Sequence, residues 1–414
     1  MGNHNLSEFK NKKVALVLSG GVVKAAAWHL GVTLALEELG FTLKSNKNSA
    51  IDEFNAKRSL EIDTYVGSSA GAMISIMLAC GLTPQEIING VLGLKKGEMK
   101  KLSYKDMFHL HKRKSKPTYT SSHQPLEEFP AIIRKVVQPF LSFPGLFSTD
   151  GAKKYLLENV LTVDSFEEFI PDLFVVATQL DHSRKVIFSK YNYPNPSHDS
   201  TAVYYTGTKV SDAAAASMSV PPFYAPYPIF NSKTAQTDYY IDGEIRETLS
   251  THVAEDNNCD IIISSWTHTP YHYHDEVGSL VNYGLQSISI QSIYLLIQKK
   301  IVASRAKRAT AIDILNTVSD YMKSEKFANK HRREILSILE RKLNVNPNIK
   351  LIDIYPDHHD YKLFFANSFS LNPDVASYTV KAGYKRTMQI LSEPEFLWSH
   401  SYLLFYLVHY LMAL

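Results

Sequence analysis

Cysteine is scarce in this chain of 414 residues, which contains only Cys80 and Cys259. Cys80 closes an apolar run typical of a buried helix, so a disulfide framework is not expected and a reducing compartment is favoured. The first residues, MGNHNLSEFKNKK, hold no apolar stretch of the kind that forms a Sec signal peptide, and Leu6 stands where N-myristoylation needs Ser or Thr. The sequence therefore predicts a cytoplasmic location.

The chain also has almost no excess of positive over negative charge. The formal net charge is +3, which is too small to indicate a nucleic-acid partner. Neither G-x-G-x-x-G nor G-x-x-x-x-G-K-[ST] occurs, so a nucleotide cofactor site lacks its glycines and its lysine-hydroxyl pair. The chain is 45% hydrophobic and 21% charged, which indicates neither disorder nor a many-span membrane protein. Its length suits one α/β domain with an appended helical region.

A candidate nucleophile stands in the segment GSSAG, residues 67–71, which fits G-x-S-x-G. Ser69 has Gly67 two residues before it and Gly71 two residues after it. A short strand is predicted before this segment, over residues 61–66, and an apolar helix after it, over residues 72–80. A serine between strand and helix occupies a strained bend, where flanking glycines avoid clashes and the helix N-terminus faces a developing oxyanion.

A glycine pair follows the first predicted strand. Residues 12–19 (KKVALVLS) form a continuous apolar run typical of a buried parallel strand. Gly20 and Gly21 end it, and a helix is predicted from about Lys24 to Glu38. A loop of this kind directs its backbone N–H groups into one concavity that suits an anion, although a plain strand-to-helix turn has the same pattern.

The third segment is residues 237–244 (TDYYIDGE), in which aromatic and β-branched residues predict a strand that ends at Asp242 and Gly243. An Asp-Gly turn is common and usually structural. Its position after the Pro-rich turn of residues 220–223 is what makes Asp242 a candidate functional residue.

Together these segments resemble the patatin-like phospholipase family of serine lipid acyl hydrolases, over about residues 12–266. The matching segments, in family order, are residues 18–24, 26–32, 67–71, 175–178 with 186–189, 213–222 and 242–243. The resemblance implies a three-layer α/β/α sandwich with a mainly parallel central sheet. It also implies a substrate that is a phospholipid or another lipid ester, with no cofactor and no metal.

The chemistry that the resemblance implies is acyl transfer by a serine–aspartate dyad. Ser69 Oγ attacks the ester carbonyl, and Asp242 takes its proton without an intervening histidine. A carboxylate base needs its pKa raised by burial, which suits a cleft for lipid chains. The implied oxyanion donors are the backbone N–H groups of Gly20, Gly21 and Val22, with Ala70 as a further contributor.

Three departures from the family pattern concern the same site. The third glycine of the oxyanion loop is Val22, and the glycine after the basic residue is Ala25. Valine adopts positive φ only at a cost of ~1–3 kcal/mol, and one misaimed donor costs ~3 kcal/mol of transition-state stabilisation. Glu244 follows Asp-Gly where the family has a small residue. The alternative to an enzyme is therefore a catalytically silent or weak patatin-like protein that binds lipid or a partner.

Histidines offer a second alternative, an α/β-hydrolase esterase with a histidine in its triad. His268, His272 and His274 follow the apolar strand predicted at residues 260–266, at the end where a crevice forms. Their spacing could also hold zinc, but no cysteine or carboxylate set completes such a site, and a solvated loop has the same composition. His29 is expected to be a satisfied, partly buried residue.

The predicted catalytic domain covers residues 12–275, after an N-terminal tail over residues 1–11. Within it, residues 95–127 form a basic loop or lid, with nine basic and two acidic residues from 95 to 116. Such a cluster attracts anionic lipid headgroups, so a peripheral contact with a membrane surface is expected; a solvated surface loop is the alternative.

Residues 276–414 are expected to be mainly helical. Helices are predicted over residues 280–300, 306–322, 326–343 and 375–391, and residues 351–355 are predicted to be a strand that returns to the sheet. Residues 396–414 are apolar and aromatic but interrupted by histidines. They are interpreted as an apolar helix docked on the core, with an interfacial anchor or a membrane span as alternatives.

Overall fold

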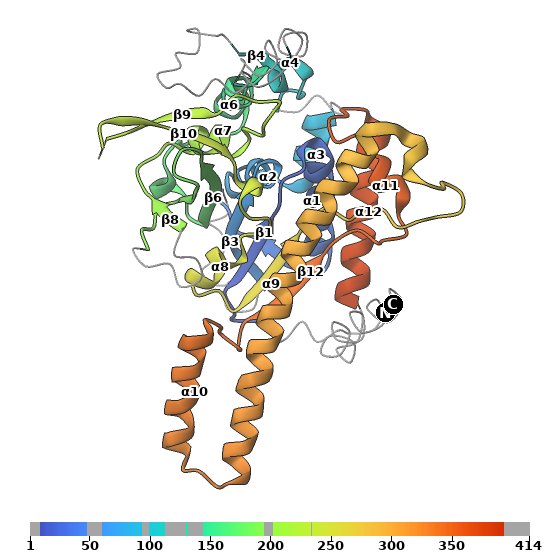
Figure 1. Ribbon diagram of the computed structural model, residues 1–414. Helices are drawn as coiled ribbons and strands as arrows, with labels where there is room; N and C mark the ends of the chain where they lie inside the picture. Colours follow the sequence, from blue (N-terminus) through green and yellow to red (C-terminus); the bar gives the residue numbers. More distant parts are fainter. Residues whose placement is uncertain are drawn as a thin grey trace.

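The computed structural model describes residues 9–47, 60–92, 99–111, 130, 144–193, 202–232 and 234–392. Its centre is a sheet in the order β12-β11-β1-β3-β6-β10-β9 (Figure 1). The strands on this path are β1 (Val14–Leu18), β3 (Leu60–Ser68), β6 (Asp172–Gln179), β9 (Tyr227–Asn231), β10 (Gln236–Asp242), β11 (Ile261–Ser265) and β12 (Lys350–Ile354). β12 to β6 are parallel to one another, and β10 and β9 are antiparallel. The predicted α/β fold with a mainly parallel sheet is confirmed.

Further strands extend the sheet at its sides. β2 (Phe41–Leu43) pairs with β3, β7 (Arg184–Phe188) forms an antiparallel hairpin with β6, and β8 (Ala202–Tyr205) pairs with β7. Shorter elements above the sheet are α4 (Tyr104–Met107), β4 (His109–Leu110), β5 (Phe147–Ser148) and α6 (Asp150–Asn159).

Side chains on the two faces of the sheet enter two separate cores, which gives the three layers. On β1, Leu16 and Leu18 belong to one core, whereas Ala15 and Val17 belong to the other. Side chains alternate across a strand, so a strand that is apolar at every position must be covered on both faces. Helices of the first face are α1 (Val22–Glu38), α2 (Ala70–Ala79), α3 (Pro84–Leu92), α7 (Val210–Ser217) and α12 (Pro373–Ser392), and α8 (Thr251–Asp256) packs on the second.

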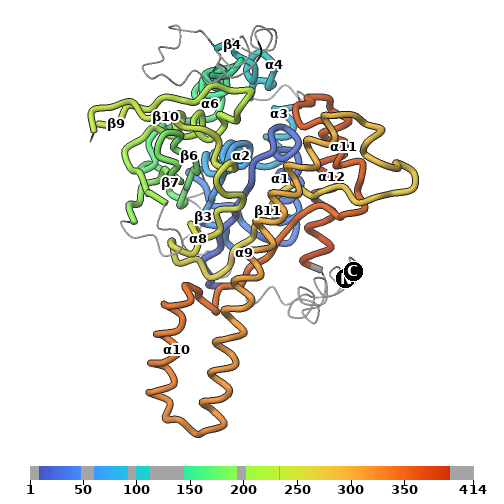
Figure 2. The backbone as a smooth tube through the Cα atoms, in the orientation of Figure 1, coloured from blue at the N-terminus to red at the C-terminus, as the bar shows by residue number. Residues whose placement is uncertain are grey.

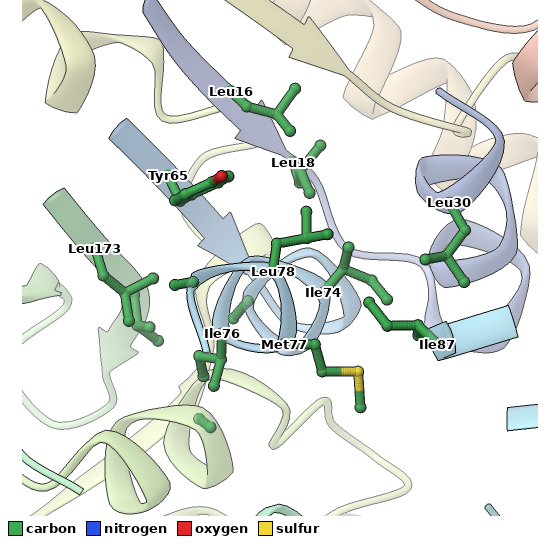
Figure 3. Packing of buried hydrophobic residues seen from close by; sticks show 14 of the residues in the cluster. Leu16, Leu18, Leu30, Tyr65, Ile74, Ile76, Met77, Leu78, Ile87 and Leu173 are labelled. Atoms are coloured by element: carbon green, nitrogen blue, oxygen red, sulfur yellow. The ribbon is translucent and has the colours of Figure 1, made fainter. Parts of the chain in front are cut away.

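The helix α2 lies at the centre of the larger core. Figure 3 shows Leu78 of α2 directed toward Leu18 of β1, whereas Met77 lies on the side of the helix that faces away from the strands. Because α2 is apolar all round, it can only be stable when neighbours cover it on every side. The bend that precedes it is therefore held by a well-packed helix.

The C-terminal region contributes to the same body. β12 pairs with β11 in parallel, which confirms the predicted late strand. The helices predicted over residues 280–300 and 306–322 are parts of one helix, α9 (Gly284–Ser324), so the predicted break between them is wrong. No glycine or proline interrupts residues 301–305, so nothing ends the helix there. α9 and α10 (Asn329–Leu343) form a hairpin that extends away from the sheet (Figure 2).

The last described helix, α12, lies against α1 (Figure 1). A Cβ atom on Gly31 would lie 2.0 Å from the Val380 carbonyl oxygen, and one on Gly383 would lie 2.4 Å from the Trp28 carbonyl oxygen. The two backbones are thus in direct contact, which fixes α12 in place. Within the described residues, no helix combines the length and hydrophobicity needed to cross a membrane. The apolar segment predicted over residues 396–414 lies outside them.

Candidate active site

The predicted nucleophile lies at the bend between β3 and α2. Ser69 has φ 53° and ψ −121°, a strained conformation for a residue with a side chain. A Cβ atom on Gly67 would lie 2.5 Å from Ala72 Cα, and one on Gly71 would lie 2.2 Å from the Leu18 carbonyl oxygen. Both glycines are therefore required by the close approach of backbone, and the bend raises Ser69 above the end of the sheet.

A second serine holds this bend, and sequence reasoning did not assign it a role. Ser217 Oγ accepts a hydrogen bond from the Ser69 backbone N–H at 2.8 Å and donates one to the Val176 carbonyl at 2.6 Å. The residue is fully buried. Its place within the segment 213–222, which resembles a family motif, was the signal that could have identified it.

The predicted base, Asp242, reaches the same place from β10, and its side chain is hydrogen-bonded to that of Ser69. The Asp242 backbone N–H donates to the Ser219 carbonyl at 3.0 Å, and Thr178 Oγ1 donates to the Asp242 carbonyl at 3.1 Å. Burial raises the pKa of the Asp242 carboxyl to about 6, against which the hydrogen bond from Ser69 acts. The structure thus brings together two side chains that are far apart in the sequence.

The oxyanion loop lies between β1 and α1. Gly21 has φ 130°, and added side-chain atoms there would meet Ala25 Cβ at 2.9 Å and Thr267 Oγ1 at 3.0 Å. Val22 has φ 58°, so the positive φ that a glycine would adopt is retained at Val22 in spite of its side chain. The helix α1 begins at Val22, two residues earlier than predicted.

Glu244 enters this loop from the base segment. Its Oε1 accepts a hydrogen bond from the Gly20 N–H at 2.8 Å, while its own N–H donates to Asp242 Oδ1 at 2.9 Å. Burial, and next the negative charge of Asp242, raise the pKa of the Glu244 carboxyl to about 8. One of the predicted oxyanion donors, Gly20 N–H, is therefore occupied by a carboxyl group. The departure from the family pattern at residue 244 singled out this position in the sequence, but it did not predict the contact with the Gly20 N–H.

The histidines take structural positions. His29 lies between the Ser19 carbonyl, 2.9 Å from its Nε2, and Ser265 Oγ, 3.0 Å from its Nδ1. Burial lowers its pKa to about 4 and that of His268 to about 3, so both rings are neutral. The ring of His268 packs on Tyr294 behind the oxyanion loop, so it does not lie between Ser69 and Asp242.

The other two histidines of the cluster lie elsewhere. His272 packs its ring on His358, and His274 packs on Tyr361, each at a centroid distance of 4.7 Å. Among the residues that the structure describes, no group of three or more His, Cys, Asp or Glu side chains is arranged to hold a metal ion.

An apolar cavity opens beside Ser69. It contains about 990 Å³ of empty space, part of it open to solvent. Its walls come from α1, α2, α3 and α12, and include Ala27, Leu30, Met77, Ile88, Ala376 and Val380. Such a cavity suits a hydrocarbon chain, because nearly all of its lining side chains are apolar.

Part of the predicted basic loop borders this cavity. Leu102 and Met107 are buried and line it, while Lys100, Lys101 and Lys105 are exposed. Within the described part of the segment, Leu102 and Met107 thus face the cavity, and the three lysines face solvent. Residues 95–98 and 112–127 of the predicted loop lie outside the described residues, and its role as a lid stays a prediction.

The strand β3, the bend at Ser69 and the carboxyl of Asp242 lie together at one edge of the sheet of an α/β sandwich. A family model for patatin-like phospholipases matches residues 16–255, more than half of the chain, so the chain belongs to the patatin-like phospholipase family. No curated protein matches the chain in a sequence search. Membership supports a lipid acyl hydrolase in general terms. The segments that follow residue 255, including α9, β12 and α12, lie outside the matched region.

Proposed function

We propose that this protein is a lipid acyl hydrolase of the phospholipase A or lysophospholipase type, which cleaves carboxylic esters with the dyad Ser69 and Asp242. The observation that carries the proposal is that the Ser69 side chain, on the wall of an apolar cavity, lies within hydrogen-bonding reach of the buried Asp242 carboxyl. A hydroxyl beside a buried carboxylate is the arrangement that activates a serine nucleophile.

The reaction proceeds in two halves. Asp242 accepts the hydroxyl proton while Ser69 Oγ bonds to the ester carbonyl carbon, and the tetrahedral intermediate collapses as the alcohol leaves with that proton. Water then gives a proton to Asp242 and attacks the acyl-enzyme, which releases the fatty acid and restores the serine. The Asp242 pKa of about 6 leaves the carboxylate ionised at neutral pH and basic enough to accept a proton.

The negative oxygen needs donors that are not already bonded. Gly20 N–H is bonded to Glu244, so we assign the main donation to the N–H groups of Gly21 and Val22, with Ala70 at the start of α2. The positive end of the α2 dipole adds to this stabilisation because it faces the Ser69 bend.

The cavity is proposed to hold the acyl chain, and the exposed lysines of the basic segment to contact an anionic membrane surface from the cytoplasm. This arrangement would let the protein draw a chain from the bilayer without crossing it.

The test combines activity with covalent labelling. We expect activity on a nitrophenyl ester and on mixed-micelle phospholipid that is lost in Ser69→Ala and Asp242→Asn, with fluorophosphonate labelling located at Ser69 by mass spectrometry. Activity that persists in Ser69→Ala would overturn the assignment. Activity that survives Asp242→Asn but not His268→Ala would favour a histidine triad. Lipid binding without labelling or turnover would identify a silent patatin-like protein.

A further inference from the structure

We propose that Glu244 is a positioning residue of the acyl-transfer site, which holds the oxyanion loop to the segment that carries Asp242. The inference rests on the proposed function, because it gives Glu244 a role in the same reaction. It concerns a residue at which this chain departs from the small residue of the family pattern.

The first support is the convergence of three segments on Gly20. Its N–H is bonded to Glu244 Oε1 at 2.8 Å. A Cβ atom on Gly20 would lie 2.7 Å from Glu244 Cγ and 2.9 Å from Ser69 Cβ. The loop, the nucleophile and the Glu244 side chain are therefore in direct contact, so a movement of any one of them displaces the others.

The second support is the position of the backbone. Glu244 lies in the short 3-10 turn Gly243–Ile245, and its N–H bonds Asp242 Oδ1 at 2.9 Å. One residue thus orients the base through its amide and the oxyanion loop through its carboxyl. The loop needs such a restraint, because Val22 holds a positive φ that a valine does not favour.

The third support is the charge state of the two carboxyls, Asp242 and Glu244, which lie close enough to affect each other. The negative charge of Asp242 raises the pKa of Glu244. The Gly20 N–H and the hydroxyls of Thr248 and Ser68, which lie beside the Glu244 carboxyl, lower it. With pKa values raised to about 6 for Asp242 and about 8 for Glu244, the pair carries one negative charge near neutral pH, on the base. Glu244 is then a neutral acid that bonds Gly20 without repelling the oxyanion.

The experiment compares Glu244→Ala with Glu244→Gln in the full chain. Alanine leaves the buried Gly20 N–H without its acceptor, so kcat should fall by about 10- to 100-fold while KM changes by less than about threefold. Glutamine keeps an acceptor oxygen without a titrating proton. It should recover most of kcat, and it should remove the fall in activity above about pH 8 that we expect of the wild type.

Controls distinguish a failure of the role given to Glu244 from a failure of the proposed function. Glu158→Gln, on an exposed face of α6, should behave as wild type. Loss of activity in Ser69→Ala together with wild-type kcat and pH profile in Glu244→Ala would overturn only the role of Glu244. A rise in kcat in Glu244→Ala would also overturn it, since Glu244 would then withhold a donor. If Glu244→Ala unfolds, the pH profile of Glu244→Gln decides: an unchanged alkaline fall refutes the proposal.

Discussion

Substitution of Val380 by phenylalanine should shorten the acyl chains that the protein accepts. Val380 and Ala376 lie one turn apart on α12 and line the cavity beside Ser69. The helix cannot retreat easily from a larger side chain, because the space beside it is already filled: a Cβ on Gly31 would lie 2.0 Å from the Val380 carbonyl oxygen. The new ring must therefore enter the cavity.

The size of the effect follows from the carbon atoms displaced. Phenylalanine has four more side-chain carbons than valine, which is room for about three methylene groups of a substrate chain at ~0.8 kcal/mol each. Burial of a long chain should weaken by ~2.4 kcal/mol, or about 50-fold in kcat/KM. Short esters, which do not reach α12, should lose little.

The assay is kcat/KM for a series of nitrophenyl esters from acetate to palmitate. Val380→Phe should lower the values for the long esters alone, and Lys381→Phe, which adds a ring on the exposed side of the same helix, should leave the series unchanged. An equal loss for acetate and palmitate, or no loss for palmitate, would refute the idea that the cavity holds the chain.

Further predictions concern the dyad and its supports. The wild-type kcat/KM should rise with pH through about 6, because Asp242 must lose its proton to act as a base, and a flat profile there would contradict this role. The folded-state pKa of Asp242 exceeds its ordinary value of 3.8, so the fold loses stability as pH rises from about 3.8 through about 6. Asp242→Asn should therefore be more stable than wild type at neutral pH by up to ~3 kcal/mol, and its melting temperature should be higher. A lower melting temperature would count against burial as the cause of the raised Asp242 pKa. Gly71→Ala should lower the melting temperature and abolish activity, because its Cβ would meet the Leu18 carbonyl at 2.2 Å; calorimetry and ester hydrolysis measure both. Ser217→Ala should reduce kcat by about 10- to 100-fold, since the Ser69 backbone loses its acceptor, and unchanged kcat would show that the bend needs no such support.

Local patterns in the sequence were sufficient for the elements that carry the site. The glycines around Ser69, the apolar run of β1 and the Asp-Gly at the end of β10 each reflect constraints within a few consecutive residues, such as positive φ, close backbone approach and burial on both faces. For that reason the bend, the loop and the base segment could be predicted individually. The break predicted at residues 301–305 was wrong for a reason that is also local, because no residue there ends the helix.

Only the tertiary structure decided which groups meet. The order of strands brings the end of β10 beside the end of β3, and the turn after β10 then places Glu244 on Gly20, more than 200 residues away in the chain. The same holds for α12, which enters the cavity from beyond the region that matches the family. Hydrophobic periodicity determines which face of an element is buried, but it contains no information about which neighbour covers that face. The amino-acid sequence by itself thus determined the separate segments of the patatin-like fold, whereas packing determined the surroundings of Asp242 and the wall of the cavity.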